Sequence, residues 1–308
     1  MPASDRLIRI GTRGSPLALA QTGLVREALV QTGLAPQVAF AVEVIRTTGD
    51  RVVDRPLAEV GGKGLFSKEI DEAMLDSRID IAVHSVKDLP TWLPDGIVLA
   101  AVLPREDPRD VLVAAVERLA DLPAGALVGT SSPRRRAQIL ARRPELRVGL
   151  LRGNVHTRLA RVREGAVAAT LLARAGLRRL GLEAIGAALD VEEMVPAVGQ
   201  GAVGVTCRED DALMREMLAM IDDAVAAREV VTERAMLALL DGSCRTPIGG
   251  LARHAEAGGL ELRGLVARPD GSQLLEGLRS GGIADGAAMG ADLGRELRDR
   301  AGPGFFEL

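Results

Sequence analysis

Aromatic side chains are scarce in this sequence: its 308 residues include one Trp, four Phe and no Tyr. Proteins that bind single-stranded nucleic acid usually stack the bases on aromatic rings, so this shortage argues against that class of function. The net charge argues against it as well, because 42 acidic side chains outnumber 39 basic ones and nucleic acids favour basic surfaces. We therefore expect no nucleic-acid partner.

Cysteine and histidine are also rare. The two cysteines, Cys207 and Cys244, are too few for a disulfide framework, and the three scattered histidines offer no metal-ligand spacing. Nowhere do eighteen apolar residues follow one another without a charge, and the first residues contain no long apolar segment typical of a secretion signal. These absences predict a cytoplasmic protein without a membrane span and without a metal site.

Lysine is restricted to Lys63, Lys68 and Lys87, and arginine supplies the other 36 basic side chains. Ten of these arginines lie between Thr130 and Arg163, a stretch that contains one acidic residue. Because the whole chain is slightly acidic, this concentration of positive charge indicates an anionic partner. Guanidinium groups suit carboxylates and phosphates, which they bind through two parallel hydrogen bonds.

The beginning of this stretch predicts a strand that leads into a helix. Residues 127–129 are apolar, Ser132 is a favourable N-cap, and Pro133 is a favourable first helical residue. The backbone N–H groups of Thr130, Ser131 and the residues after them, together with the positive end of the helix dipole, should then face one spot. We expect Arg134 and Arg135 to lie beside that spot.

A second junction of the same kind follows. Residues 147–151 read as a strand, Arg152 and Gly153 as a turn, and Asn154 as the N-cap of a helix that places Arg158 one turn inside. Two such junctions in tandem predict a site for several carboxylates or phosphates. The alternative, that arginines coat solvated helix faces, applies more to the arginines away from the junctions, which are Arg136, Arg142, Arg143, Arg161 and Arg163.

The N-terminal part contains a third junction. An alternating strand at 7–10 is followed by Arg13, and Ser15 with Pro16 predicts the start of a helix. After a strand at 38–44, about twenty polar and glycine-rich residues precede the next helix. We interpret this stretch as a mobile lid that contains Lys63 and Phe66, with hinges at Gly61, Gly62 and Gly64.

Lys87 and Asp88 emerge together from a buried strand at 79–83. Open α/β sheets bind ligands at the carboxyl ends of their strands, and an adjacent cation and carboxylate suit proton transfer. The alternative is that Asp88 caps a turn before Pro90. His84 is interpreted as a buried wall residue rather than a base.

Alternating strands and helices predict an α/β fold in two lobes with mixed, mostly parallel sheets. We expect residues 1–103 and 198–221 to form the first lobe and 104–197 the second. Residues 222–308 read as a small α+β domain of a helix, three short strands with a hairpin turn at 269–271, and a final helix. Two lobes joined by two crossings resemble a hinged clamp with its site in the cleft.

The C-terminal domain contains Cys244 on a glycine-flanked loop next to Arg245. A neighbouring cation favours the thiolate, which is the nucleophilic form of cysteine. The alternative is an inert buried thiol, and Cys207, which lies inside a predicted strand, fits that description.

Eight motifs that occur in order over about 240 residues resemble those of the porphobilinogen deaminase family, also called hydroxymethylbilane synthase. They are R-x-S-P-L-A-L-A-Q (Arg13 to Gln21), V-G-G-K-G-L-F-x-K-E (Val60 to Glu69), D-I-A-V-H-S-x-K-D-L-P (Asp80 to Pro90), R-E-D-P-R-D (Arg105 to Asp110), G-T-S-S-x-R-R (Gly129 to Arg135), L-R-G-N-x-x-T-R (Leu151 to Arg158), A-V-G-Q-G-A (Ala197 to Ala202) and G-x-C-x-x-P-I-G (Gly242 to Gly249). Each motif alone is weak, but their common order makes chance implausible. Ser243 and Pro133 depart from the family's usual glycine and leucine, and neither change removes a charged group.

The resemblance implies a monomer with two lobes similar to the type II periplasmic-binding fold and a third domain whose cysteine holds a dipyrromethane cofactor through a thioether. It implies an enzyme that condenses four porphobilinogen molecules head to tail onto this cofactor, with loss of ammonia, and releases hydroxymethylbilane by hydrolysis. Each pyrrole ring carries an acetate and a propionate, so six rings carry about twelve carboxylates, which suits many guanidinium groups. A two-lobed anion receptor is the rival hypothesis, and it leaves Cys244 without a role.

The resemblance also implies individual roles. Cys244 is expected to hold the cofactor, and Asp88 to act as the acid and base. The cofactor carboxylates are expected to contact Lys87, Thr130, Ser131, Ser132, Arg134, Arg135, Gly153, Asn154 and Arg158. The incoming ring or growing chain is expected to contact Arg13, Ser15, Arg152, Arg179, Gln200 and Gly201, with Lys63 and Phe66 in the lid.

Overall fold

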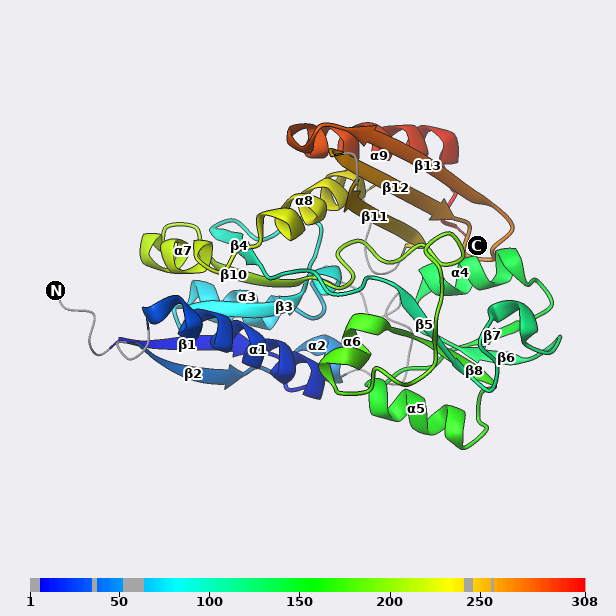
Figure 1. The fold of residues 1–308 in the computed structure, drawn as a ribbon, viewed down its shortest axis with the longest axis horizontal. Coiled ribbons are helices and arrows are strands. Elements are labelled where there is room, and N and C mark those ends of the chain that lie inside the picture. Colours follow the sequence, from blue (N-terminus) through cyan, green and yellow to red (C-terminus); the bar gives the residue numbers. More distant parts are fainter. Residues whose placement is uncertain (1–5, 35–37, 52–63, 241–245, 256–257, 308) are drawn as a thin grey trace. The chain divides into compact units, whose positions relative to one another are not determined.

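The computed structural model describes residues 6–34, 38–51, 64–240, 246–255 and 258–307 (Figure 1). The chain divides into two compact units. The first contains residues 1–52, 62–106 and 202–227, and the second contains 53–61, 107–201 and 228–308. In the described part of the chain, no helix combines the length and the apolar character that crossing a bilayer requires.

The first unit is built on a five-stranded sheet. Its strands, in spatial order, are β2 (Val38–Val44), β1 (Arg6–Thr12), β3 (Ile81–Ser85), β10 (Val203–Arg208) and β4 (Ile97–Val102). β1 pairs in parallel with β2 and β3, whereas β10 pairs antiparallel with β3 and β4. Four strands therefore run one way and β10 runs the other.

Helices cover both faces of this sheet because its apolar side chains alternate between them. α1 (Pro16–Leu29) and α7 (Ala212–Ala219) pack on one face through residues such as Val25 and Met217. α3 (Lys68–Leu75) packs on the other through Ile70 and Met74. The short elements are a π-helical turn at Val30–Leu34, α2 (Thr48–Arg51) and a 3₁₀ turn at Val86–Asp88.

The second unit contains a second five-stranded sheet. Its strands, in spatial order, are β7 (Arg147–Gly149), β6 (Leu127–Gly129), β8 (Ala169–Ala173), β5 (Asp110–Ala114) and β9 (Ala187–Ala188). β6 pairs in parallel with β7 and β8, and β5 pairs antiparallel with β8 and β9. Its helices are α4 (Pro133–Arg142), α5 (Val155–Arg163) and α6 (Arg174–Arg179), and a 3₁₀ turn spans Leu119–Asp121.

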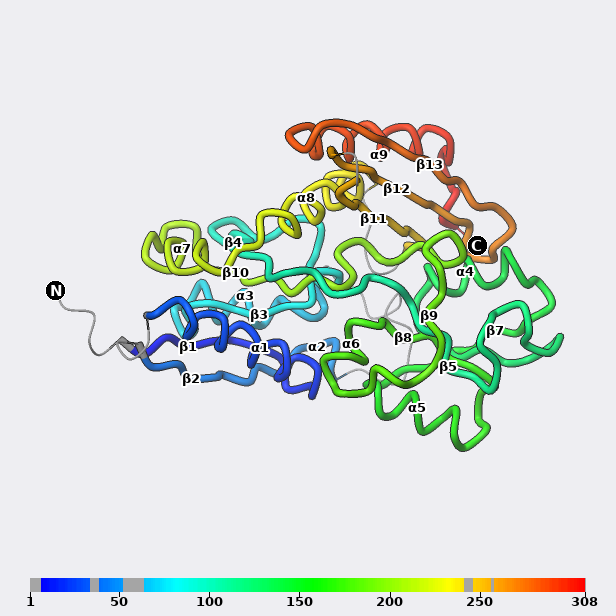
Figure 2. Tube along the Cα trace, in the orientation of Figure 1, coloured from blue at the N-terminus to red at the C-terminus, as the bar shows by residue number. Residues whose placement is uncertain are grey.

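The two sheets share one topological feature, the place in the chain of the single strand that runs against the others. The strand of opposite direction, β10 in the first sheet and β5 in the second, is in each case the first strand after the chain passes from one unit to the other. Figure 2 shows this along the trace, where yellow-green β10 lies between cyan β3 and β4. The predicted α/β class with mixed, mostly parallel sheets is confirmed.

The C-terminal part of the second unit is an antiparallel sheet of β11 (Ile248–His254), β12 (Leu260–Ala267) and β13 (Leu274–Gly281). α9 (Gly286–Ala301) follows a 3₁₀ turn at Ile283–Asp285, and α8 (Ala224–Leu239) begins in the first unit and continues in the second. Apolar side chains of both helices pack on this sheet. The predicted hairpin turn is confirmed, with Gly271 at φ +79°.

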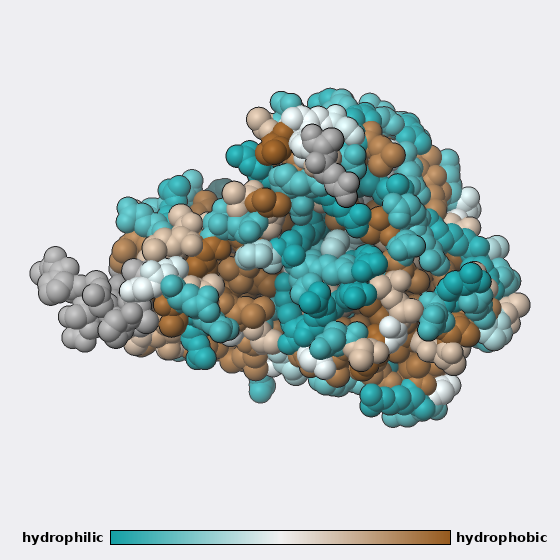
Figure 3. Space-filling model, in the orientation of Figure 1, coloured by the Kyte–Doolittle hydropathy of each residue, from teal (hydrophilic) through white to brown (hydrophobic). Residues whose placement is uncertain are grey.

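The surface of the first unit mixes polar and apolar residues, as Figure 3 shows for the face in view. Its exposed large apolar side chains include Leu7, Leu19 and Leu24. Scattered apolar exposure of this kind is ordinary for a folded protein.

α8 and α9 approach each other closely at three glycines spaced by four residues, Gly286, Gly290 and Gly294. A Cβ atom added at Gly290 would lie 2.2 Å from the carbonyl oxygen of Thr232 and 2.9 Å from the Cβ of Ala235. The obstacles include α8 backbone, which cannot rotate away as a side chain can. Glycine is therefore required here by packing.

We expect Gly290→Ala to lower the free energy of unfolding by about 2 kcal/mol, because overpacking against backbone outweighs the better helix propensity of alanine. Gly23→Ala in α1 is the matched control, since a Cβ there meets no atom within 4 Å. It should raise the free energy of unfolding by about 0.5–1 kcal/mol. Urea unfolding measures both, and equal effects would contradict the close packing of α8 and α9.

Candidate active site

Arg13 follows β1 and is held on several sides within the first unit. Its Nε donates to Asp50 Oδ2 at 3.1 Å, and its Nη2 also pairs with Asp50. The guanidinium lies over the ring of Phe66, 4.1 Å from the centroid. The remaining nitrogen, Nη1, is 3.7 Å from Asp88 Oδ2. Asp50 and Phe66 thus fix the orientation in which Arg13 meets Asp88.

This arrangement keeps both partners of the main pair charged. Burial opposes the charge of Arg13, but the hydrogen bond to Asp50 and the charge of Asp88 raise the pKa of Arg13 overall. Burial likewise opposes ionisation of Asp50, but the bonds from Arg13 and Thr47 lower the pKa of Asp50. Arg13 therefore presents a permanent positive charge to Asp88 at neutral pH.

Asp88 ends the 3₁₀ turn that follows β3. Its side chain is 35% exposed, whereas Val86 and Leu89 on either side are buried. The backbone N–H of Val86 also donates to Ala202 O at 3.1 Å. Asp88 therefore combines a fixed backbone with a carboxylate that reaches solvent, which suits a group that transfers protons. Lys87 precedes it on the same turn.

His84 lies in β3 and is buried, with Nε2 3.0 Å from Thr206 Oγ1 in β10. Burial, assisted by the charge of Arg13, lowers the pKa of His84 to about 4. The residue is neutral at physiological pH, as expected for a wall residue. Next to it, Ser85 Oγ accepts a hydrogen bond from Gln21 Nε2 at 2.9 Å.

In the second unit, the first predicted junction is confirmed. α4 begins at Pro133, and Ser132 Oγ accepts from the backbone N–H of Arg135 at 3.4 Å as its N-cap. Thr130 Oγ1 accepts from the N–H of Ser132 at 3.1 Å. The helix therefore starts where the N-cap and proline indicate.

The side chains of Arg134 and Arg135 point into the fold. Their Nη2 atoms donate to the two oxygens of Asp110 at 2.8 and 2.7 Å, and their Nη1 atoms donate to the carbonyls of Val195 and Leu171. Both side chains are buried, with exposed fractions of 5% and 7%. Their contact with cofactor carboxylates stays a prediction.

Asp110 is a residue that sequence reasoning missed. It is fully buried at the start of β5. Burial disfavours its charge, but the positive charges of Arg134 and Arg135 hold the pKa of Asp110 well below its usual range. A carboxylate at the end of the motif R-E-D-P-R-D was the available signal, but nothing local indicates which arginines it meets.

The second junction also has the predicted form. Asn154 Oδ1 caps α5 by accepting from the N–H of Thr157 at 3.0 Å, and Gly153 has φ +109°. The expected strand at 147–151 is shorter, because β7 ends at Gly149 and the chain turns before α5. Arg158 donates to Ser131 Oγ at 3.4 Å. This bond joins the two junctions, and the half-buried Arg152 lies at the second.

The alternative of solvated helix faces holds for only some of the arginines away from the junctions. Arg136, Arg161 and Arg163 are exposed. Arg142 and Arg143 are half-buried and donate to backbone carbonyls, which makes them structural.

The turn of A-V-G-Q-G holds two further predicted residues. Gln200 is buried, and its Nε2 donates to Pro108 O at 2.7 Å and to Asp110 Oδ1 at 2.8 Å. Gly201 O accepts from Arg179 Nη2 at 2.6 Å. Gln200 therefore shares Asp110 with Arg134 and Arg135, and Gly201 follows it in the chain.

Of the two cysteines, Cys207 is among the described residues. Cys207 is buried in β10, as expected, and burial raises the pKa of its thiol to about 11. Cys244 and Lys63 lie outside the described residues. For Ser15, the structure shows an N-cap role, since its Oγ accepts from the N–H of Ala18 at 3.2 Å.

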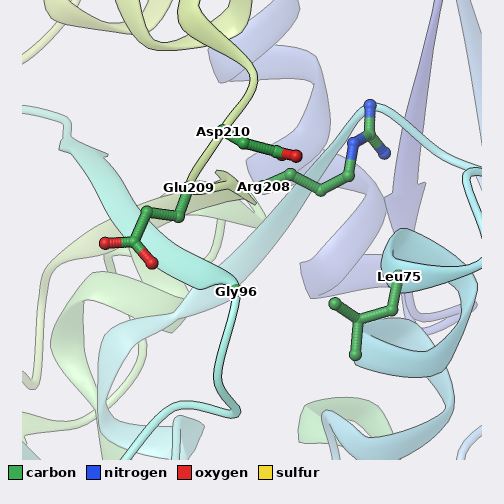
Figure 4. Close-up of a pocket in the computed structure, with 5 residues that line it drawn as sticks. All are labelled: Leu75, Gly96, Arg208, Glu209 and Asp210. Atoms are coloured by element: carbon green, nitrogen blue, oxygen red, sulfur yellow. The ribbon is translucent and has the colours of Figure 1, made fainter.

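A pocket of about 460 Å³ in the first unit lies elsewhere (Figure 4). Its lining residues are Leu75, Gly96, Arg208, Glu209 and Asp210. Gly96 precedes β4 and Arg208 ends β10. The pocket therefore lies where β3 begins, whereas Asp88 follows the other end of β3. Arg208 already donates to two carbonyls and to Asp211. The pocket contains none of the predicted site residues.

These features define an α/β protein that has, in its first unit, a solvent-reaching carboxylate paired with arginine at the end of a strand and, in its second unit, arginines gathered at two helix N-termini. The comparisons with known proteins agree. A family model described as "Porphobilinogen deaminase, dipyromethane cofactor binding domain" matches residues 8–216, and one described as "Porphobilinogen deaminase, C-terminal domain" matches residues 227–299. The chain belongs to the porphobilinogen deaminase family.

Relatives match over essentially the whole chain. Porphobilinogen deaminase of Paracoccus denitrificans is 54% identical over 100% of this chain and 98% of its own length. The chloroplastic enzyme of Pisum sativum is 52% identical over 97% of this chain and 83% of its own. Among solved structures, a TRAP periplasmic solute binding protein from Desulfovibrio salexigens has a TM-score of 0.43 at 10% identity, covering 73% of each chain.

The chain is therefore a transferase of tetrapyrrole biosynthesis, a hydroxymethylbilane synthase. It condenses four porphobilinogen molecules in steps onto a dipyrromethane cofactor and then releases hydroxymethylbilane.

The described residues fit this cofactor. Two rings carry four carboxylates, and the second unit offers two helix N-termini together with Ser131, Arg152 and Arg158. In addition, the buried Nε atoms of Arg134 and Arg135 have no hydrogen-bond partner among the described residues. Two guanidinium groups on one carboxylate leave a surplus positive charge that suits an anionic cofactor.

Protonation of His84 should make stability depend on pH. An unfolded histidine titrates near 6.5, above the folded value of about 4. The unfolded chain therefore binds the proton first, so the stabilisation is complete above about pH 6.5 and is lost progressively as pH falls toward about 4. Between pH 7 and pH 5, wild type should lose on the order of 2 kcal/mol more than His84→Gln.

Urea unfolding at the two pH values measures this difference. The comparison with the variant is needed because burial raises the pKa of Asp71 to about 6, which acts in the opposite direction over the same range. The exposed His156, changed to Gln, is the control and should keep the wild-type pH slope. The same slope in His84→Gln and wild type would show that His84 titrates normally.

Proposed function

We propose that Asp88 is the acid and base of each condensation step and that Cys244 carries the dipyrromethane cofactor. The observation that carries the first assignment is the half-exposed Asp88 carboxylate at the carboxyl end of β3, 3.7 Å from an Arg13 guanidinium. That position is where open α/β sheets act on their ligands. The second assignment is supported by the family membership and by the inert environment of Cys207.

The chemistry requires one group that tolerates positive charge and accepts a proton. When ammonia leaves porphobilinogen, the methylene carbon becomes cationic, and the Asp88 carboxylate stabilises that charge. The carbon of the acceptor ring that attacks this methylene forms the new carbon–carbon bond. It must then lose its proton, and Asp88 accepts that proton. The cofactor supplies the first acceptor ring and its carboxylates.

The cationic groups of each unit, taken by itself, are assigned to binding carboxylates. Arg13 offers the incoming ring its Nη1 edge, because Asp50 occupies the opposite edge. Ser131, Arg152 and Arg158 act with the N-termini of α4 and α5 on the cofactor and the growing chain. The remaining expected contacts are retained in the proposal: Lys87, Thr130, Ser132, Arg134, Arg135, Gly153 and Asn154 for the cofactor, Ser15, Arg179, Gln200 and Gly201 for the substrate, and Lys63 and Phe66 in the lid.

We also propose that the enzyme acts as a monomer in the cytoplasm. The family resemblance supports the first statement. The bacterial relatives support the second.

The cysteine assignment is tested by intact mass of protein made in cells that form porphobilinogen. Wild type should carry an adduct of two pyrrole rings, and Cys244→Ala should lack it, because the thioether sulfur is gone. Cys207→Ala is the control and should retain the adduct. An unmodified wild type, or an adduct that persists in Cys244→Ala, would favour the rival reading of an anion receptor or a different attachment site.

The Asp88 assignment predicts that Asp88→Asn keeps the adduct and slows turnover by roughly 10² to 10⁴, since the amide accepts no proton. Asp95→Asn, an exposed aspartate in the loop that leads to β4, is the matched control and should turn over normally. The measurement is hydroxymethylbilane formation per adduct-bearing molecule. Near-normal turnover in Asp88→Asn would remove this residue from the mechanism.

A further inference from the structure

The Gly199–Gly201 turn lies between two buried carboxylates, both in the second unit. On one side, Asp110 accepts from Gln200 Nε2 at 2.8 Å. On the other, Glu233 Oε2 accepts from the backbone N–H of Gly199 at 2.6 Å. Both carboxylates are fully buried. A turn that is hydrogen-bonded on two sides to buried carboxyl groups is a rigid element rather than a surface loop.

The Asp110 side connects the turn to the start of α4. Asp110 binds Arg134 and Arg135 in the first turn of that helix, as well as Gln200. Gln200 Nε2 donates in addition to the carbonyl of Pro108, just before β5. One carboxylate therefore joins the turn to the helix whose N-terminus belongs to the proposed cofactor site.

The Glu233 side connects the same turn to the C-terminal sheet. Glu233 lies in α8, and its second oxygen accepts from the N–H of Ala252 in β11 at 2.8 Å. Backbone contacts reinforce this connection, since the N–H of Gly250 donates to Pro196 O at 2.9 Å. A Cβ added at Gly249 would lie 3.1 Å from Val195 O. α8 and β11 are the elements on either side of the segment that contains Cys244.

We propose that Asp110 and Glu233 are positioning residues that couple the C-terminal sheet to the N-terminus of α4 through the Gly199–Gly201 turn, and that acquisition of dipyrromethane depends on this coupling. The inference rests on the proposed attachment at Cys244. Neither residue takes part in proton transfer. Their function is to hold in place, before the cofactor arrives, α8 and β11, which flank Cys244 in the sequence, and the N-terminus of α4, which is proposed to bind the cofactor's carboxylates.

A purely structural role makes a different prediction. If the two carboxylates merely stabilise the fold, replacing any other buried, hydrogen-bonded carboxylate by its amide should have the same effect on cofactor loading. Asp80 provides that comparison, because it is buried and accepts from Arg9 Nε at 3.0 Å and Nη2 at 2.9 Å, with Arg208 3.6 Å away. It belongs to the first unit and precedes β3, at the opposite end from Asp88.

The test uses full-length apoprotein made in cells that lack porphobilinogen. Porphobilinogen is added, and formation of the two-ring adduct is followed by intact mass. Asp110→Asn and Glu233→Gln should each load about tenfold more slowly than wild type, because each leaves a buried donor without its charged acceptor. Asp80→Asn should lose stability in urea but load at the wild-type rate.

Hydrogen exchange of the apoprotein supplies a readout independent of loading. Glu233→Gln should speed exchange at residues 133–142 of α4, which Glu233 does not touch. Asp110→Asn should speed it at residues 248–254 of β11. Asp80→Asn should change neither segment. Gln200→Met is a milder variant for the case that either charge change prevents folding, because it keeps both carboxylates and removes only the bonds of the Gln200 side chain. It should speed exchange in both α4 and β11.

The outcomes separate the two hypotheses. If wild type itself forms no adduct, or Cys244→Ala still forms one, the proposed function fails. If wild type loads through Cys244 while the Asp110, Glu233 and Gln200 variants load at the same rate, the coupling is wrong. Exchange changes confined to the immediate neighbours of each substituted residue would overturn it as well.

Discussion

The second unit depends on one buried ion cluster, in which the carboxylate of Asp110 lies between Arg134 and Arg135. Removing charges from water is costly, and the cost is offset here by short hydrogen bonds on both oxygens. Because these bonds reach α4, β5 and the Gly199–Gly201 turn, the same carboxylate fixes three segments distant in sequence. The cluster is still one positive charge in excess, which suits a protein that handles carboxylates.

The first unit orders its key arginine in a related way. Asp50 and the ring of Phe66 occupy one edge and one face of Arg13, so that the remaining edge meets Asp88. In both units an acid that belongs to the fold orients arginine. This matters for catalysis because a preorganised cation costs no reorganisation when charge develops in the reaction.

Several local features were predictable from the sequence because neighbouring residues determine them. Ser15, Ser132 and Asn154 cap helices where their side chains indicate, and the thiol of Cys207 is buried in a strand. Other expectations needed more than neighbours. The strand expected at 147–151 ends at Gly149, because pairing with β6, which ends at Gly129, limits its length. The direction of Arg134 and Arg135 depends on Asp110, more than twenty residues earlier.

The α/β class, the helix starts, the concentration of arginine and, through eight ordered motifs, the family could all be read from the sequence alone. Those properties follow from local propensity, composition and residue identity. Folding in three dimensions sets which arginines face inward and which acids they meet. It also sets that Gln200 donates to Asp110 while the N–H of Gly199 donates to Glu233. Such pairings depend on strand order and on the burial of particular charges, because a guanidinium group binds whichever carboxylate the fold brings within about 3 Å.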